Sequence, residues 1–209
     1  AKRIPARLQN FHLSVGITDE FWSAFLNGTV FPLRNPRSGE IAERIDAREL
    51  FDKIVAAAWA SGDPGLIFLD EINRANPTPG LGEIEATNPC GEQPLLPYES
   101  CTLGSINLAA FSAKHDLDWQ RLSQAIQDGV VFLDNVIDAN HFPFPAIETA
   151  TRRTRKIGLG VMGLADLFAR LGIAYDSEEA LICADKIAKF LAAEGWRASI
   201  ELAQRRGSF

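Results

Sequence analysis

The sequence has 209 residues, which suits one domain or a large part of a bigger one, and its apolar content of 46% is ordinary for a globular protein. Its formal net charge of −6 argues against binding to nucleic acid, because an acidic chain repels the phosphate backbone. No apolar run reaches the length of a membrane span, so no membrane contact is expected.

Alternating strands and helices are predicted in the first half of the chain. A strand is expected at 11–15, followed by a helix at 19–26 that Thr18 caps and Gly28 ends. Strands at 30–33 and 40–45 flank a turn and predict a hairpin. A helix from Asp46 to about Ala60 and a buried strand at 66–69 follow.

The second half is richer in helix. A strand is expected at 101–108, and then a helix at 118–137, whose apolar residues recur at helical spacing: Leu122, Ile126, Val130, Leu133 and Ile137. Pro145 opens another helix, a short strand and a helix lie within 158–170, and Asp176 is expected to cap a last long helix to about Gln204. This order predicts an α/β fold, taken as one unit over residues 1–209.

Residues 76–97 interrupt this pattern. They hold five of the chain's eleven prolines, together with Gly80, Gly82 and Gly91. Regular structure does not persist through such a run, because each proline fixes φ and lacks an N–H donor. A loop of this length inside a compact domain is usually functional or disordered, and its apolar residues and cysteine favour a long, ordered, functional loop.

The loop carries the residues best suited to chemistry. In an extended segment, residues two apart point the same way, so Asn88, Cys90 and Glu92 are expected to face one small ligand together. Two thiols near a carboxylate, Cys90 and Cys101, indicate redox or covalent chemistry. Spacing alone leaves a cysteine hydrolase open, with His115 or His141 as the base.

The remaining cysteine and the other possible sites give weaker signals. Cys183 lies on an apolar helical face and is expected in the core. Three cysteines without a secretory signal indicate a reducing, cytoplasmic setting, and none has zinc-site spacing, so no metal site is expected.

Two motifs resemble ligand sites but favour a structural interpretation. The glycines at 158, 160 and 163 match a dinucleotide-binding pattern, yet a basic helix end precedes them where that pattern needs a strand, so close strand–helix packing is favoured. The cluster Arg152, Arg153, Arg155 and Lys156 could bind phosphate, but a solvated helix C-terminus is favoured.

The segment 88–95, Asn-Pro-Cys-Gly-Glu-Gln-Pro-Leu, resembles the finger-loop motif of adenosylcobalamin-dependent (class II) ribonucleotide reductases. The following Tyr-Glu-Ser-Cys at 98–101 and Leu-Gly-Ser-Ile-Asn-Leu at 103–108 also resemble that family, as do the segments 10–15, 62–65 and 155–163 in the same order. The resemblance therefore covers nearly the whole chain. It implies an internal part of a ten-stranded α/β barrel, with a central finger loop at about 76–101 that carries Cys90.

The resemblance also implies a role for each matching residue. Cys90 would carry the thiyl radical that abstracts the ribose 3′-hydrogen, and Glu92 would be the general base toward the 3′-hydroxyl. Asn88 would hydrogen-bond the substrate hydroxyls, and Cys101 would be one half of the dithiol that reduces the 2′ position. The implied cofactor is adenosylcobalamin, as the source of the radical, and the implied substrate is a ribonucleoside diphosphate or triphosphate.

Partners and alternatives complete the expectation. A thioredoxin-like or glutaredoxin-like reductant and a homodimer are expected for the full enzyme. No cysteine precedes Cys90 to pair with Cys101, so the 209-residue chain is expected to be inactive alone. The alternatives are a class I large-subunit fragment served by a separate radical-generating subunit, a degenerate non-catalytic binding module, and the cysteine hydrolase.

Overall fold

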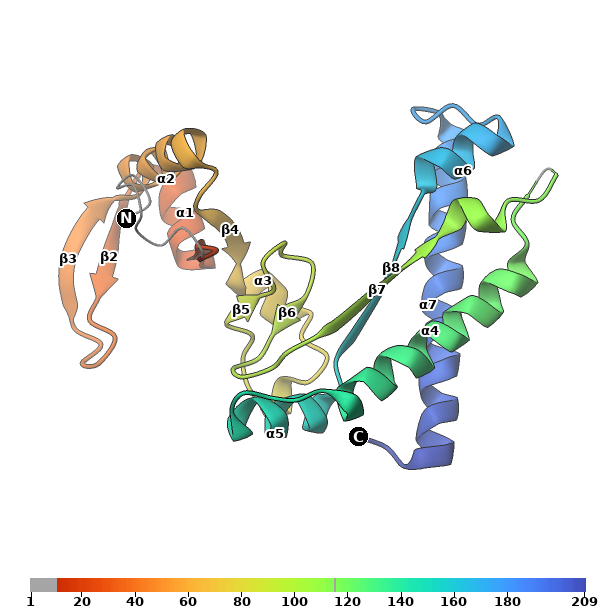
Figure 1. The fold of residues 1–209 in the computed structure, drawn as a ribbon. Helices are drawn as coiled ribbons and strands as arrows, with labels where there is room; N and C mark the ends of the chain where they lie inside the picture. Colours follow the sequence, from red (N-terminus) through yellow and green to blue (C-terminus); the bar gives the residue numbers. More distant parts are fainter. Residues whose placement is uncertain (1–10, 115) are drawn as a thin grey trace. The chain divides into compact units, whose positions relative to one another are not determined.

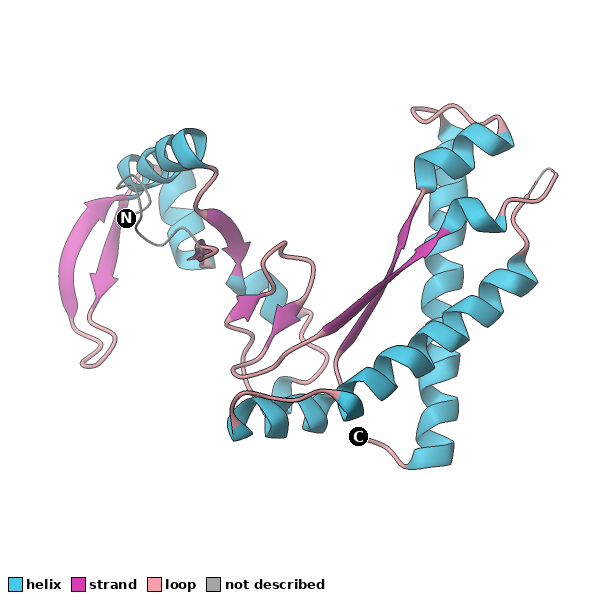
Figure 2. Cartoon of the chain, viewed as in Figure 1, coloured by secondary structure: helices cyan, strands magenta, loops and turns pink. Residues whose placement is uncertain are grey.

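A computed structural model describes residues 11–114 and 116–209. It divides the chain into two compact units, Ala1–Pro97 and Tyr98–Phe209, each considered by itself below. The α/β class is confirmed, since helices and strands alternate through the described residues (Figure 2). The eight described strands form four two-stranded sheets, so the partial barrel and its extent over 1–209 stay predictions.

The first unit contains a parallel strand pair and an antiparallel hairpin (Figure 1). Its elements are β1 (Ser14–Ile17), α1 (Asp19–Asn27), β2 (Val30–Arg34), β3 (Ile41–Asp46), α2 (Ala47–Ser61), β4 (Gly65–Phe68), α3 (Leu69–Arg74), the 3-10 helix η1 (Pro79–Leu81), β5 (Ala86–Thr87) and β6 (Pro94–Leu95). β1 pairs parallel with β4, β2 antiparallel with β3, and β5 antiparallel with β6.

Capping decides where the first two helices begin and end. The Thr18 side chain accepts a hydrogen bond from the Phe21 N–H, and Gly28 ends α1 at a φ of 63°. Asp46 accepts from the Arg48 and Glu49 N–H groups and starts α2. The predicted helices and the β2–β3 hairpin are thereby confirmed.

Two details of the first unit differ from expectation. The first strand lies at Ser14–Ile17 and not at 11–15, because Ile17 is the residue that packs in the core with Phe21. The strand expected to be buried at 66–69 is mostly exposed, and Leu69 belongs to helix α3 instead, because periodicity alone does not separate a short apolar strand from the first turn of a helix.

The second unit sets two long helices against a parallel strand pair. It contains β7 (Thr102–Asn107), the 3-10 helix η2 (Leu108–Phe111), α4 (Trp119–Ala139), α5 (Pro145–Thr154), β8 (Ile157–Met162), α6 (Leu164–Leu171) and α7 (Glu178–Arg206). β7 and β8 pair in register from Thr102 opposite Ile157 to Asn107 opposite Met162. Helix α4 contacts both strands and α7 (Figure 1).

The buried face of α4 forms much of the second unit's core. All five of its predicted core residues are buried, at Leu122, Ile126, Val130, Leu133 and Ile137. Leu122 and Ile126 join Leu167 of α6 and Ile187 of α7 in one apolar cluster. Cys183 packs against this cluster, as expected, and burial raises the pKa of its thiol.

The last helix has a different cap from the one expected. Ser177 caps α7 and accepts a hydrogen bond from the Ala180 N–H at 3.1 Å, so Asp176 lies one residue outside the helix. Both residues are good caps by type, and the sequence pattern alone did not separate them. Among the described residues, no helix is long and apolar enough to cross a membrane.

Candidate functional site

The motif residues form the tip of a short hairpin. β5 and β6 pair Ala86 with Leu95 and Thr87 with Pro94, and residues 88–93 connect them. The Gly91 N–H donates to the Asn88 carbonyl at 3.1 Å, and Gly91 has a φ of 90° that favours glycine. The expected extended path through Asn88, Cys90 and Glu92 is therefore wrong, because a turn replaces it.

Asn88 closes this turn with its own side chain. Its Oδ1 accepts a hydrogen bond from the Gln93 N–H at 3.0 Å, and its backbone N–H donates to the Gln93 carbonyl at 3.1 Å. Asn88 is half-buried, whereas the side chains of Cys90 and Glu92 are exposed at the tip. The structure thus places the three residues on one hairpin, with Cys90 as a free thiol open to solvent.

Two asparagines that sequence reasoning missed hold the loop below this tip. The Asn73 side chain of α3 donates to the Ile84 carbonyl at 2.9 Å and accepts from the Ile84 N–H at 2.8 Å. Asn76 donates to the Gly82 carbonyl at 3.0 Å and accepts from the Thr78 N–H at 2.9 Å. Asparagine beside prolines and glycines was an available signal, since its amide can replace the missing ladder bonds.

Apolar residues complete the support of the loop. Ile84 and Leu96 are buried within this Pro- and Gly-rich segment, at 4% and 7% exposure. The Glu85 N–H donates to the Leu95 carbonyl at 3.2 Å and extends the β5–β6 pairing. Residues 76–97 are therefore ordered by specific contacts, as the composition predicted.

Cys101 lies in the second unit, directly before β7. Its side chain is half-buried, and the residues on both sides of it are fixed. The Glu99 carboxylate, 1% exposed, pairs with the Lys156 ammonium at 2.5 Å. The Ser100 and Thr151 hydroxyl oxygens lie 2.8 Å apart, and Thr151 is itself buried.

Only part of the basic cluster is a solvated helix end, since Arg152 and Arg153 are exposed in the last turn of α5 whereas Arg155 and Lys156 are not. Arg155 is 19% exposed and pairs with Asp134 at 2.6 Å and with Asp138 at 2.9 Å. Hydrogen bonds from the Arg155 guanidinium hold the pKa of Asp138 below its usual range. The expectation was wrong for Arg155 and Lys156, because carboxylates far away in the sequence fold onto them.

The glycine pattern is structural, as expected. Gly158 and Gly160 lie inside β8 itself, and Gly163 follows the strand before α6. A Cβ on Gly163 would lie 2.4 Å from the Asn107 Oδ1, so this position requires glycine for close approach as well as for its φ of 72°. A dinucleotide site would need the first glycine at the end of a strand.

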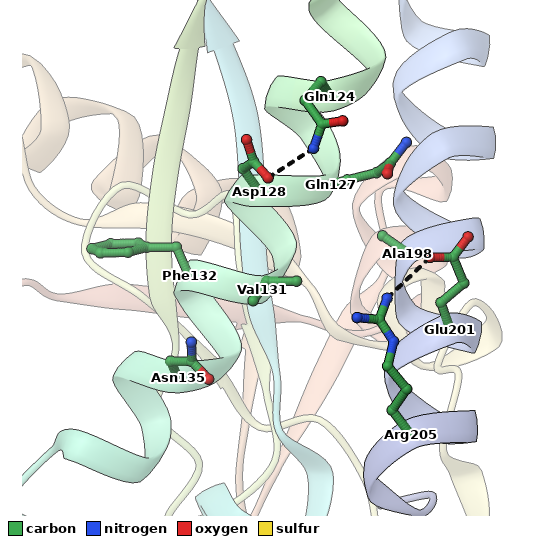
Figure 3. Close-up of a pocket in the computed structure, with 9 residues that line it drawn as sticks. All are labelled: Gln124, Gln127, Asp128, Val131, Phe132, Asn135, Ala198, Glu201 and Arg205. Atoms are coloured by element: carbon green, nitrogen blue, oxygen red, sulfur yellow. Dashed lines mark hydrogen bonds and ion pairs between the residues drawn. The ribbon is translucent and has the colours of Figure 1, made fainter.

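A groove runs between α4 and α7, with a volume of about 460 Å³ (Figure 3). It is lined by Gln124, Gln127, Asp128, Val131, Phe132, Asn135, Ala198, Glu201 and Arg205. None of the four predicted site residues lines it. Within residues 11–114 and 116–209, no group of three or more His, Cys, Asp and Glu side chains could hold a metal ion.

The structure does not test either proposed hydrolase base. His141 is exposed and lies in the second unit, before α5, while His115 is outside the described residues. The cysteine hydrolase therefore stays an untested alternative.

Comparisons with known proteins agree over nearly the whole chain. Residues 3–209 match the family described as "Ribonucleotide reductase, barrel domain". A vitamin B12-dependent ribonucleoside-diphosphate reductase of Mycobacterium tuberculosis is 57% identical over 98% of this chain and 30% of its own length. A protein of the same name from Thermoplasma acidophilum is 53% identical over 97% of this chain and 26% of its own length.

A solved structure gives the same relationship. The alpha subunit of a class Id ribonucleotide reductase from Actinobacillus ureae superposes with a TM-score of 0.73 and 27% identity, over 94% of this chain and 36% of that one. The chain therefore spans about 30% of the length of the first of these curated relatives.

Proposed function

Because the chain belongs to the ribonucleotide reductase barrel-domain family, we propose that it is part of an adenosylcobalamin-dependent enzyme that reduces ribonucleotides to 2′-deoxyribonucleotides. The observation that carries the proposal is the 57% identity to a relative named a vitamin B12-dependent ribonucleoside-diphosphate reductase. The 27% identity to a class Id subunit is lower, which favours the B12-dependent branch over a class I fragment. The relative's name also favours a diphosphate substrate.

The hairpin tip supports Cys90 as the radical-bearing residue. Its thiol is exposed, and a Cβ on the adjacent Gly91 would have no atom within 4 Å, so a substrate and a cofactor have room to approach. Adenosylcobalamin, when bound, would supply the radical that removes the hydrogen atom of the Cys90 thiol. No residue of this chain is assigned to the corrin ring.

Each motif residue then has a separate role in the reaction. The Cys90 thiyl radical takes the ribose 3′-hydrogen atom and later returns it, so the cysteine is regenerated. Glu92, exposed on the same turn, accepts the proton of the 3′-hydroxyl. Asn88 uses its Oδ1 to close the turn, and its side-chain N–H groups are available to donate to the substrate hydroxyls.

Cys101 is proposed as one of two reducing thiols. It gives up one electron and one proton, and a second cysteine elsewhere in the longer protein gives up the same. The C2′–O bond breaks, water leaves, and one S–S bond forms. A thioredoxin-like or glutaredoxin-like dithiol then restores both thiols by exchange. Action in the cytoplasm and a homodimer belong to the same proposal.

The experiment is single-residue substitution in the full-length polypeptide that contains this segment. Cys90→Ser is expected to abolish deoxyribonucleotide formation, because a serine O–H does not form the radical reversibly, while Cys183→Ser is the matched thiol control and should retain turnover. The assay is run with and without adenosylcobalamin. Turnover without the cofactor would refute the B12-dependent branch, and turnover by Cys90→Ser would refute the role of Cys90.

A further inference from the structure

We propose that Glu99 and Lys156 are positioning residues for Cys101, and that their opposite charges set the balance between its thiol and thiolate forms. The inference deepens the proposed function and rests on it, since it concerns the reducing thiol. The side chain of Glu99 is 1% exposed, whereas carboxylates ordinarily lie at the protein surface.

A buried ion pair needs a reason beyond stability. Moving Glu99 and Lys156 out of water is unfavourable for each ion, and their attraction at 2.5 Å offsets this only where the geometry is good. A well-packed apolar pair at the same place would often be as stable. The structure nevertheless holds both charges, at 1% and 14% exposure, next to a cysteine.

Strand register places the pair beside that cysteine. Thr102 of β7 is the partner of Ile157 of β8, and the two strands are parallel. Cys101 and Lys156 are the residues immediately before these partners, so they occupy neighbouring positions across the two strands. Glu99 is two residues before Cys101, and its carboxylate pairs with the Lys156 ammonium, so both charges belong to this end of the strand pair.

The backbone on both sides of Cys101 is also held. Thr151 of α5 accepts from the Ser100 N–H at 3.3 Å, and the Thr102 hydroxyl donates to the Leu133 carbonyl at 3.4 Å. Tyr98 reaches this segment through a φ of 64°, a conformation that a residue with a side chain adopts only when its surroundings enforce it. Cys101 thus sits in a held segment, and the strand register sets it beside the ion pair of Glu99 and Lys156.

The chemistry of a reducing thiol explains the arrangement. Cys101 must lose a proton when the disulfide forms, and it must regain one when an external dithiol reduces that disulfide. An adjacent cation favours the thiolate and an adjacent anion favours the thiol. A paired cation and anion keep both forms accessible, which neither charge achieves alone.

The test measures the reactivity of Cys101 itself, in the full-length polypeptide. The rate of its alkylation by iodoacetamide is followed by mass spectrometry from about pH 6 to about pH 10, which spans the ordinary thiol pKa of about 8.5. Glu99→Gln leaves the cation alone and is expected to shift the inflection to lower pH. Lys156→Met leaves the anion alone and is expected to shift it to higher pH.

Each shift is expected to change the rate below the inflection by about tenfold, the change that one pKa unit produces. Lys156→Arg keeps the charge and should restore the wild-type profile. Greater exposure of the thiol would raise the plateau rate at high pH and lower the inflection in either variant, whereas the charge effect moves the inflection in opposite directions in the two variants, so the two effects separate. Cys90 and Cys183, measured in the same digests, report any general loosening.

Shifts in the same direction for both variants, or no shift in either, would overturn the inference. If Lys156→Met does not fold, the isosteric Glu99→Gln decides alone, and an inflection that stays or rises refutes the proposal. The readout needs no turnover. If Cys90→Ser keeps turnover while Glu99→Gln and Lys156→Met shift the Cys101 inflection in opposite directions, only the proposed function is contradicted.

Discussion

Replacing Asn73 by alanine should release the loop that carries Cys90. The Asn73 side chain satisfies both backbone groups of Ile84, accepting from its N–H at 2.8 Å and donating to its carbonyl at 2.9 Å. Ile84 is 4% exposed, so water does not replace these bonds while the loop stays folded. Each buried backbone group left unsatisfied costs about 1–3 kcal/mol.

Two such groups predict a loss of about 2–4 kcal/mol, allowing for partial relaxation of the loop. The measurement is urea-induced unfolding of the wild type and the variant, together with hydrogen exchange of the Ile84 amide. Asn76→Ala is the matched control, because its bond to the Gly82 carbonyl is exposed, and it should cost about 0.5–1.5 kcal/mol.

Hydrogen exchange adds a local readout. The Ile84 amide should lose protection in Asn73→Ala and keep it in Asn76→Ala, because only Asn73 contacts that amide. If Asn73→Ala unfolds within about 0.5 kcal/mol of the wild type and Ile84 stays protected, these bonds do not hold the loop and the argument is wrong.

Two further predictions concern the second unit. Arg155 lowers the pKa of Asp138, so the stability that this carboxylate contributes is present above the unfolded pKa of about 3.9 and is lost as pH falls through the folded pKa. Because the carboxylate is half exposed, Asp138→Asn should change the free energy of unfolding at pH 7 by only about 0.2–1 kcal/mol. The variant should also lose less stability than the wild type as the pH is lowered, and an unchanged acid dependence would contradict this. Gly163→Ala should destabilise the fold by about 1–3 kcal/mol more than Gly172→Ala in thermal unfolding. Both glycines have positive φ, but only at Gly163 would a Cβ meet the Asn107 side chain, so equal losses would remove the steric argument.

Local features of the sequence determined most of the secondary structure. The spacing of apolar residues in α4 predicted its buried face, because apolar residues at helical spacing form one stripe that must pack against the core. Thr18, Gly28 and Asp46 predicted helix boundaries, since capping involves residues only two to five positions apart. The density of proline and glycine in 76–97 predicted an ordered loop for the same local reason.

The motif residues were identified from the sequence, but their geometry was not. Asn88, Cys90 and Glu92 were expected on one extended face, and the structure turns the chain at Gly91 instead. The turn depends on the pairing of β5 with β6, and the pattern of residues within the loop did not predict that pairing. The roles of these residues stay predictions until the substitutions are made.

Only the tertiary structure showed what surrounds the charges. Arg155 and Lys156 were expected in solvent, because cations interact favourably with the dipole at a solvated helix C-terminus. Folding brings Asp134 to Arg155 and Glu99 to Lys156, across separations in the chain that no periodicity encodes. The sequence by itself therefore determined the helices, the loop and the family, whose signals are local, whereas the environment of Cys101 was decided by long-range contacts that exist only once β7 and β8 are paired.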